Sequence, residues 1–70
     1  MAEERLTNSL KIHRAALNLT QADLAEMIGT TRKSINAIEA GRMVPSTFLA
    51  LKLARALNLQ VESIFALSVV

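Results

Sequence analysis

The sequence predicts an all-α fold, a compact bundle of five short helices in a single domain. Apolar residues recur three and four positions apart over most of the chain, which is the spacing of a buried helical face. Ser, Thr and Asn residues that cap helix starts, and Gly and Asn residues that end helices, divide the chain at intervals. We expect residues 1–70 to form one domain with a modest core over about 8–66.

The first predicted helix begins after Thr7 or Asn8, because either side chain can accept a hydrogen bond from a first-turn amide. Asn18 marks its end, since asparagine tolerates the left-handed backbone of a helix terminus. One face of this helix carries Leu10, Arg14 and Leu17.

The second and third predicted helices lie on either side of Gly29. The second begins after Thr20, and Asp23 stands three residues later at the spacing of a capping box. Gly29 ends it, because glycine adopts a positive φ without strain. The third follows the cap Thr31 and stops at Gly41. Their apolar faces consist of Leu24, Ala25 and Ile28 in the second helix and Ile35 and Ile38 in the third.

The fourth predicted helix follows a loop that contains Pro45, with Ser46 as its cap and Asn58 at its end. Its buried stripe comprises Leu49, Ala50, Leu53, Ala54 and Leu57. A last short helix is expected over about 62–66. The residues expected to close the core there are Val61, Ile64 and Phe65.

Composition argues against several classes of function. The chain has no Cys and one histidine, His13, so we expect neither a disulfide framework nor a zinc site, and we interpret His13 as a packed or rim residue rather than a pH switch. No spacing suggests a catalytic trio, and we expect no enzyme activity, cofactor or small-molecule ligand. No run of about 18 apolar residues could span a membrane. The polar start Met-Ala-Glu-Glu is unlike a signal peptide, so a cytoplasmic location is expected.

Residues 20–39 have the layout of a helix-turn-helix, in which two short helices meet at a tight turn. The small Ala25 allows the two helices to cross closely. Arg32 and Lys33 stand at the front of the second of these helices. Two cations at the positive end of a helix dipole cost stability, and DNA would supply the reason for their presence. The net charge of +2 is a weak indication in the same direction.

Residues 10–65 resemble the helix-turn-helix family of the phage repressor and Cro proteins, also called the xenobiotic-response-element type. The resemblance implies a lambda repressor-like fold and a DNA-binding transcription regulator. It rests on many residues at unbroken spacing: Arg14, Thr20-Gln21, Leu24-Ala25, Ile28-Gly29, Ser34-Ile35, Ile38-Glu39, Gly41, Pro45-Ser46, Leu53-Ala54 and Leu57.

The resemblance implies that the third helix reads DNA base edges. Arg32 can give two hydrogen bonds to O6 and N7 of guanine, and Lys33 can reach the same edge with less defined geometry. Ala37 offers a methyl group for contact with thymine, and Asn36 can reach a base or a phosphate. The alternative is a solvated helix start with no partner.

The resemblance assigns other residues to DNA phosphates. Gln21 begins the second helix, where free amides and the dipole favour an anion, and Arg42 follows the third helix. Ser34 and Thr31 carry hydroxyl groups near the same edge, although a capping role is the simpler interpretation of Thr31. For Gln21 the alternative is a polar helix position without a ligand.

The resemblance also implies an ion pair between Arg14 and Glu39, which would tie the first helix to the end of the third. Its role would be to orient the third helix rather than to add net stability, because shielded pairs often only break even. The alternative is two ordinary exposed charges.

The C-terminal tail is apolar, and a chain of this size has little interior in which to bury it. We expect Phe65, Leu67, Val69 and Val70 to form a homodimer interface, with residues 67–70 as a dimerisation tail. The tail is expected either to extend the last helix or to pair as a strand with residues near Leu6; a frayed terminus is the alternative.

The sequence therefore predicts a homodimeric, sequence-specific DNA-binding transcription regulator, most simply a repressor acting on a near-palindromic site. The alternative is a protein-interaction module, such as an antitoxin or an accessory subunit, in which DNA binding is secondary. The cations at the start of the third helix favour the first hypothesis.

Overall fold

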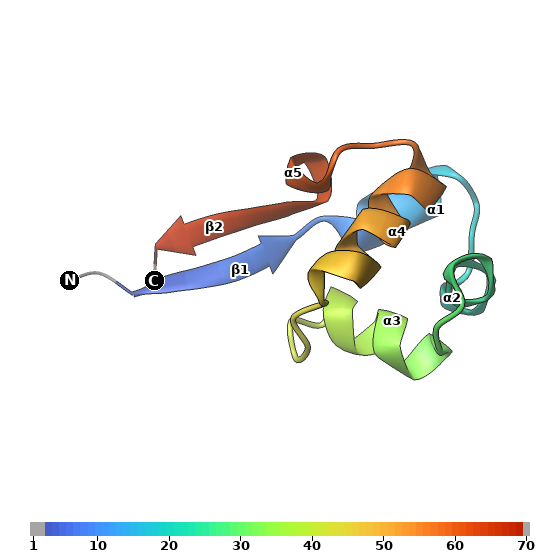
Figure 1. Ribbon diagram of the computed structural model, residues 1–70, viewed down its shortest axis with the longest axis horizontal. Helices are drawn as coiled ribbons and strands as arrows, with labels where there is room; N and C mark the ends of the chain where they lie inside the picture. The colour runs from blue at the N-terminus through green and yellow to red at the C-terminus, as the bar shows by residue number, and fades with distance from the viewer. Residues whose placement is uncertain (1–2, 70) are drawn as a thin grey trace.

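A computed structural model describes residues 3–69 and shows a small helical body from which a two-stranded ribbon projects (Figure 1). The molecule measures 39 × 21 × 21 Å, and its long axis follows the ribbon. The elements along the chain are β1 (Glu4–Asn8), α1 (Leu10–Ala16), α2 (Gln21–Ile28), α3 (Arg32–Glu39), α4 (Thr47–Leu57), α5 (Val61–Ile64) and β2 (Phe65–Val69). The predicted five-helix, lambda repressor-like fold is confirmed, and the two terminal segments add a small sheet.

The ribbon joins the two ends of the chain as an antiparallel pair. In its register Leu6 lies opposite Leu67, Glu4 opposite Val69 and Asn8 opposite Phe65. The tail is thus a strand, and it pairs with residues around Leu6, which was one of the two conformations expected for it.

Local caps set the limits of α2 as predicted. The Thr20 hydroxyl accepts a hydrogen bond from the Asp23 amide, and the Asp23 carboxylate accepts one from the Thr20 amide, each at 2.9 Å. These two bonds make a complete capping box. Gly29 ends the helix with φ +73°, a left-handed conformation that side chains other than glycine's strain to adopt.

The remaining caps follow the same local rules. The hydroxyl groups of Thr31 and Ser46 each accept a hydrogen bond at 3.1 Å from the amide three residues later, at the starts of α3 and α4. Asn18 and Asn58 both have φ +57° and end their helices in the left-handed conformation expected of them.

The structure corrects the predicted ends of the first and last helices. Thr7 and Asn8 belong to β1, and α1 begins after Ser9, which is one residue beyond the later of the two expected starts. The Asn8 side chain still accepts a hydrogen bond from the Leu10 amide at 3.1 Å. The last helix covers Val61–Ile64 instead of 62–66, because Phe65 and the residue after it pair with β1.

The core lies where the helices converge. Its fully buried side chains are Leu10, Leu24, Ile35, Ile38 and Leu53, one or two from each of the first four helices. Ala50, Ala54 and Leu57 complete the predicted stripe of α4, whereas Leu49 is only partly buried. Leu17 was expected to share a helical face with Leu10, but it follows the end of α1 and is 52% exposed.

Leu53→Ala is expected to lower the free energy of unfolding by about 2–5 kcal/mol, because Leu53 is 0% exposed and its removal leaves a cavity between α4 and the other helices. Leu17→Ala is the matched control, since the same truncation at a half-exposed leucine is expected to change stability by less than about 1 kcal/mol. Urea unfolding followed by circular dichroism measures both. Equal losses in the two variants would contradict this description of the core.

Candidate nucleic-acid interface

Helices α2 and α3 pack against each other across the turn at Gly29. The Thr30 amide donates to the Ala25 carbonyl at 2.9 Å, which closes the end of α2, and Ala25 itself is buried. The apolar faces of both helices contribute to the common core. Helix α3 therefore lies at the edge of the body with its opposite face uncovered (Figure 1).

The uncovered face of α3 carries the side chains that the sequence singled out. Arg32 and Lys33 are exposed in its first turn, and no acidic residue accompanies them there. Asn36 and Ala37 follow one turn later and are half-buried. A face of this kind leaves the cations free to meet an anion from solvent.

Two hydroxyl groups at the start of α3 are engaged with each other. Thr31 accepts a hydrogen bond from the Ser34 amide and donates one to the Ser34 hydroxyl, both at 3.1 Å. Thr31 therefore acts as the helix cap in this structure. Phosphate contacts from Thr31 and Ser34 stay predictions.

An ion pair between Arg14 and Glu39 joins α1 to the last residue of α3. Arg14 Nε and Nη2 donate to the two carboxylate oxygens of Glu39 at 2.7 and 3.2 Å, a bidentate arrangement. The third donor, Nη1, reaches the Leu19 carbonyl at 2.6 Å. The two side chains are only 13% and 7% exposed. One guanidinium therefore binds α3 and the segment that leads into α2.

The ion pair continues into a hydrogen-bond network that joins the start of α2, α3 and the loop after α3. Gln21 Nε2 donates to Glu39 Oε1 at 3.1 Å, and Asn36 Nδ2 donates to Gln21 Oε1 at 3.4 Å. Arg42 Nη2 donates to Asn36 Oδ1 at 2.8 Å. Sequence reasoning had identified these residues one by one and had not foreseen that they contact one another, since they lie 6 to 18 positions apart.

A surface hollow of about 340 Å³ lies over this network. Its lining consists of Lys11, Arg14, Gln21, Asn36, Glu39 and Ala40. Lys11 adds an exposed cation that the sequence analysis did not single out. Its position three residues before Arg14, on the same side of α1, was the available signal.

The Glu39 carboxyl is held in its charged form. Burial raises its pKa, but hydrogen bonds from Arg14 and Gln21 and the positive charges of Arg14 and Lys11 outweigh burial, so the pKa lies below its ordinary value of 4.5. The pKa of Asp23 is also lowered, by the Thr20 amide and hydroxyl that its carboxylate contacts. Both carboxylates are therefore ionised at neutral pH.

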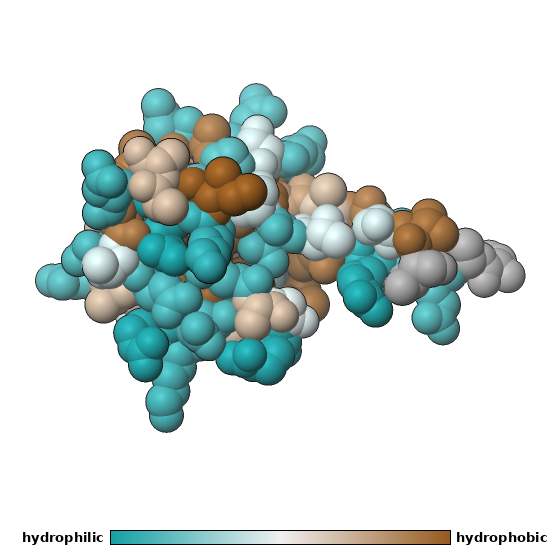
Figure 2. Space-filling view, turned by 180° about the vertical axis from the view of Figure 1, so that it is seen from behind, coloured by the Kyte–Doolittle hydropathy of each residue, from teal (hydrophilic) through white to brown (hydrophobic). Residues whose placement is uncertain are grey.

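The four predicted dimerisation residues have different environments. Phe65 packs into the core and is 8% exposed, so little of its side chain is free to meet a second molecule. Leu67 and Val69 are 70% and 69% exposed. Val70 lies outside the described residues. Hydrophobic surface accordingly extends from the body along the ribbon (Figure 2).

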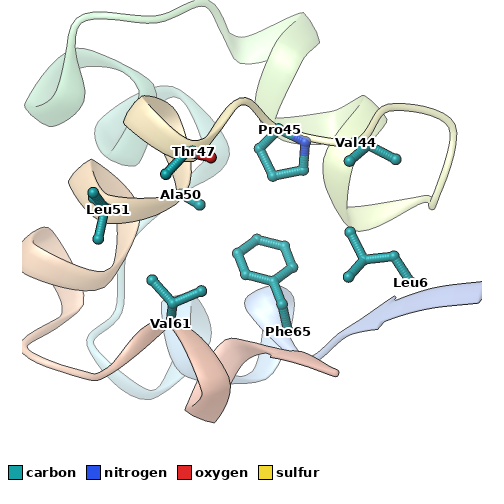
Figure 3. A pocket seen from close by; sticks show the side chains of 8 residues that line it. All are labelled: Leu6, Val44, Pro45, Thr47, Ala50, Leu51, Val61 and Phe65. Carbon is teal, nitrogen blue, oxygen red and sulfur yellow. The ribbon is translucent and has the colours of Figure 1, made fainter. Parts of the chain in front are cut away.

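An apolar groove of about 250 Å³ lies where the ribbon meets the body (Figure 3). Leu6, Val61 and Phe65 form one side, and the loop before α4 and the first turns of α4 form the other. Its full lining is Leu6, Val44, Pro45, Thr47, Ala50, Leu51, Val61 and Phe65. Val44 and Leu51 are largely exposed at its rim.

An exposed helix with a cationic start, buttressed by a second helix across a tight turn, is the arrangement of helix-turn-helix DNA-binding domains. Comparison with known proteins agrees with this class. Residues 10–64 match the model of a helix-turn-helix family. The chain belongs to the Cro/C1-type, or xenobiotic-response-element, family of helix-turn-helix transcriptional regulators.

Relatives occur in archaea and bacteria. An uncharacterized helix-turn-helix-type transcriptional regulator of Methanocaldococcus jannaschii is 47% identical over 60 residues, which cover 86% of this chain and 91% of the relative. An uncharacterized helix-turn-helix-type transcriptional regulator of Bacillus subtilis is 40% identical over 60 residues, which also cover 86% of this chain and 91% of the relative. The family consists of transcription regulators, not of enzymes, and the protein is a DNA-binding regulator of this type.

Two solved structures share the fold. The restriction-modification controller protein C.AhdI of Aeromonas hydrophila superposes with a TM-score of 0.73 at 33% identity, over 77% of this chain and 82% of that one. A crystal structure of a protein from Bacteroides fragilis gives a TM-score of 0.79 over 87% of this chain and 98% of that one. Its 24% identity carries the fold alone.

Two classes of feature are missing between residues 3 and 69. None of the helices there has the length and apolar character needed to cross a bilayer. In the same range, no three His, Asp or Glu side chains gather where they could hold a metal ion.

Glu39→Gln is expected to lower the free energy of unfolding at neutral pH by about 1–3 kcal/mol, because Arg14 loses its charged partner. It is also expected to flatten the acid side of the stability profile. The folded pKa of Glu39 lies below 4.5, so the unfolded chain binds the proton first as pH falls, and stability is lost from about that pH downward. Thermal melts between neutral pH and acid measure both effects.

Asp23 serves as the internal reference, because its lowered pKa contributes to the pH dependence of both the wild type and Glu39→Gln. Any difference between the two stability profiles is therefore due to Glu39. Parallel profiles for the two proteins would show that the ion pair does not set the acid sensitivity of the fold.

Proposed function

We propose that the protein is a homodimeric repressor that binds a near-palindromic operator in double-stranded DNA and inserts α3 into the major groove. The observation that carries this proposal is the exposed, cationic start of α3 on a helix whose far end is anchored by the Arg14–Glu39 pair. The likeness to a restriction-modification controller protein supports a regulatory role. A cytoplasmic location, where DNA is accessible, is part of the proposal.

Base reading is assigned to the exposed face of α3. Arg32 offers a guanidinium fork for guanine O6 and N7, and Lys33 offers a single cationic donor for the same edge. Ala37 is half-buried and presents a methyl group to a thymine methyl. Asn36 was also expected to contact a base or a phosphate, but its amide is hydrogen-bonded to Gln21 and to Arg42, so base reading is not assigned to it.

Positioning on the backbone is assigned to residues that flank α3. Gln21 begins α2, where free backbone amides and the helix dipole attract a phosphate, and Arg42 extends from the loop after α3. The Ser34 and Thr31 hydroxyl groups are already hydrogen-bonded in the cap of α3. To contact a phosphate, they would either form a further hydrogen bond or give up one of those in the cap.

Dimerisation is assigned to one face of the ribbon together with the groove at its base. Side chains alternate along a strand, so Leu6, Leu67 and Val69 share a face of the sheet. That face runs into the groove through Leu6 and Phe65. One copy therefore carries both an exposed apolar ridge and an apolar groove, which is the self-complementarity that a two-fold interface requires. Two α3 helices would then meet successive major grooves about 34 Å apart.

The groove also supports the second candidate function, a protein-interaction module whose DNA binding is secondary. A different protein could seat an apolar segment in the same groove. A mobility shift with random DNA across salt concentrations separates the candidates, because a DNA-binding regulator shows salt-sensitive binding even to non-specific DNA.

Arg32→Ala and Arg42→Ala are expected to affect DNA binding in different ways. Loss of Arg32 is expected to cost about 1–3 kcal/mol for the best site and to relax the preference at one base pair. Loss of Arg42 is expected to weaken all sequences about equally and to lower the salt slope by about one unit. Selection from a random DNA library, followed by titrations at several salt concentrations, measures both.

An unchanged selected sequence with Arg32→Ala would remove this residue from the list of base readers. A sequence-selective loss with Arg42→Ala would count against its assignment to the phosphate backbone.

Leu67→Glu is expected to convert dimers into monomers, because it places a charge between Leu6 and Val69, the apolar neighbours of Leu67 on this face of the ribbon. Ser68→Glu is the matched control, since the next residue of β2 points to the opposite face. Sedimentation of the two variants measures their mass, and DNA affinity is expected to fall steeply only for Leu67→Glu, since one half-site loses its tethered partner. A wild-type protein that sediments as a monomer would instead favour a separate partner protein in the groove.

A further inference from the structure

The network that starts at Glu39 has ends of opposite and fixed hydrogen-bonding character. A carboxylate only accepts hydrogen bonds, and a guanidinium only donates them. Glu39 stands at one end of the network and Arg42 at the other, and the amides of Gln21 and Asn36 lie between them. Each of these amides has one accepting oxygen and one donating nitrogen, so each could in principle face either way.

The two ends leave each amide one orientation. Gln21 must turn its NH2 group to Glu39 Oε1, at 3.1 Å, which points its oxygen toward Asn36. Asn36 must then present its NH2 group to that oxygen, at 3.4 Å, and its own oxygen to Arg42 Nη2, at 2.8 Å. If the Asn36 amide were reversed, oxygen would face oxygen on one side and nitrogen would face nitrogen on the other.

This arrangement leaves a donor on Gln21 for a ligand. The NH2 group of Gln21 has two N–H bonds, and within the described part of the chain one of them is used, by Glu39. Gln21 is the first residue of α2 and lines the surface hollow over the network. The second N–H therefore belongs to the residue that begins α2, where an anion would contact the free backbone amides.

The same arrangement also fixes the way in which the Asn36 amide could meet a base. Recognition of adenine by asparagine uses the side-chain oxygen and nitrogen together, toward N6 and N7 of the base. The Asn36 oxygen already accepts the short hydrogen bond from Arg42. A bidentate contact with adenine would have to use the second lone pair of this oxygen and the second N–H of the amide, in the orientation that Gln21 and Arg42 set.

We propose that Asn36 is a positioning residue: it orients the Gln21 amide and holds the Arg42 side chain so that both are ready to bind DNA phosphates, and it does not read a base. This inference rests on the DNA-binding function proposed above. In this proposal Asn36 holds the two phosphate-binding side chains, Gln21 and Arg42, in place before DNA arrives. Less side-chain freedom is then lost when DNA binds.

Asn36→Ala is the direct test. Binding to the best selected site and to unrelated DNA is expected to weaken by the same factor, about 3- to 10-fold, which corresponds to the loss of one or two net hydrogen bonds. The selected sequence is expected to stay unchanged. The salt slope is also expected to stay unchanged, because Arg42 keeps its charge, and this separates Asn36→Ala from Arg42→Ala.

A double-mutant cycle with Gln21→Ala adds a measure of coupling. If Asn36 acts through Gln21, then Asn36→Ala is expected to have less effect on DNA affinity once Gln21 is absent. A fully additive pair would overturn the proposal, as would a changed preference at one base pair in Asn36→Ala. The urea midpoints of the variants are compared with that of the wild type, so that a loss of folding is not mistaken for a loss of positioning.

A measurement without DNA keeps this inference separate from the proposed function. The side-chain NH2 resonances of Gln21, followed by NMR in the free protein, are expected to shift in Asn36→Ala, because the partner of the Gln21 oxygen is removed. Unshifted resonances would refute the orienting role. If the Gln21 resonances shift in Asn36→Ala but the wild-type protein binds no DNA, the proposed function is refuted, while the orienting role of Asn36 stands.

Discussion

The bidentate contact between Arg14 and Glu39 is the interaction on which the arrangement of the helices depends. Arg14 on α1 binds the end of α3 and the carbonyl of Leu19, and Glu39 in turn receives Gln21 from the start of α2. Three helices thus meet at one carboxylate. Removing two charges from water offsets much of their attraction, so we attribute to this pair the orientation of α3 rather than net stability.

The two proposed functional surfaces lie in different parts of the molecule and have opposite chemistry. The cationic start of α3 belongs to the helical body, whereas the apolar ridge of the ribbon projects from that body along its long axis (Figure 1). A contiguous patch of exposed leucine and valine on a small domain is typical of an interaction site. The groove at the base of the ribbon provides an apolar counterpart on the same chain, so one interface between two copies would cover both.

Much of the fold could be predicted from the sequence because the signals for helix ends are local. The Thr20–Asp23 capping box, the positive φ of Gly29 and the left-handed Asn58 involve residues within four positions of the helix end that they define. The periodic apolar positions likewise identified the core residues of α2, α3 and α4. The motif residues of the proposed DNA-binding face could also be identified, because their spacing resembles that of the family.

Tertiary structure decided what depends on residues far apart in the chain. Pairing of β1 with β2, 57 to 65 positions away along the chain, ended the last helix early and made the apolar tail a strand. It left Phe65 packed in the core and Leu67 and Val69 exposed. The orientation of the Gln21 and Asn36 amides was set by Glu39 at one end of the network and Arg42 at the other. The sequence by itself determined which segments become helices, since caps and periodicity act within a few residues. Only the folded chain decided which polar groups share a hydrogen bond, because that requires distant residues to reach the same place.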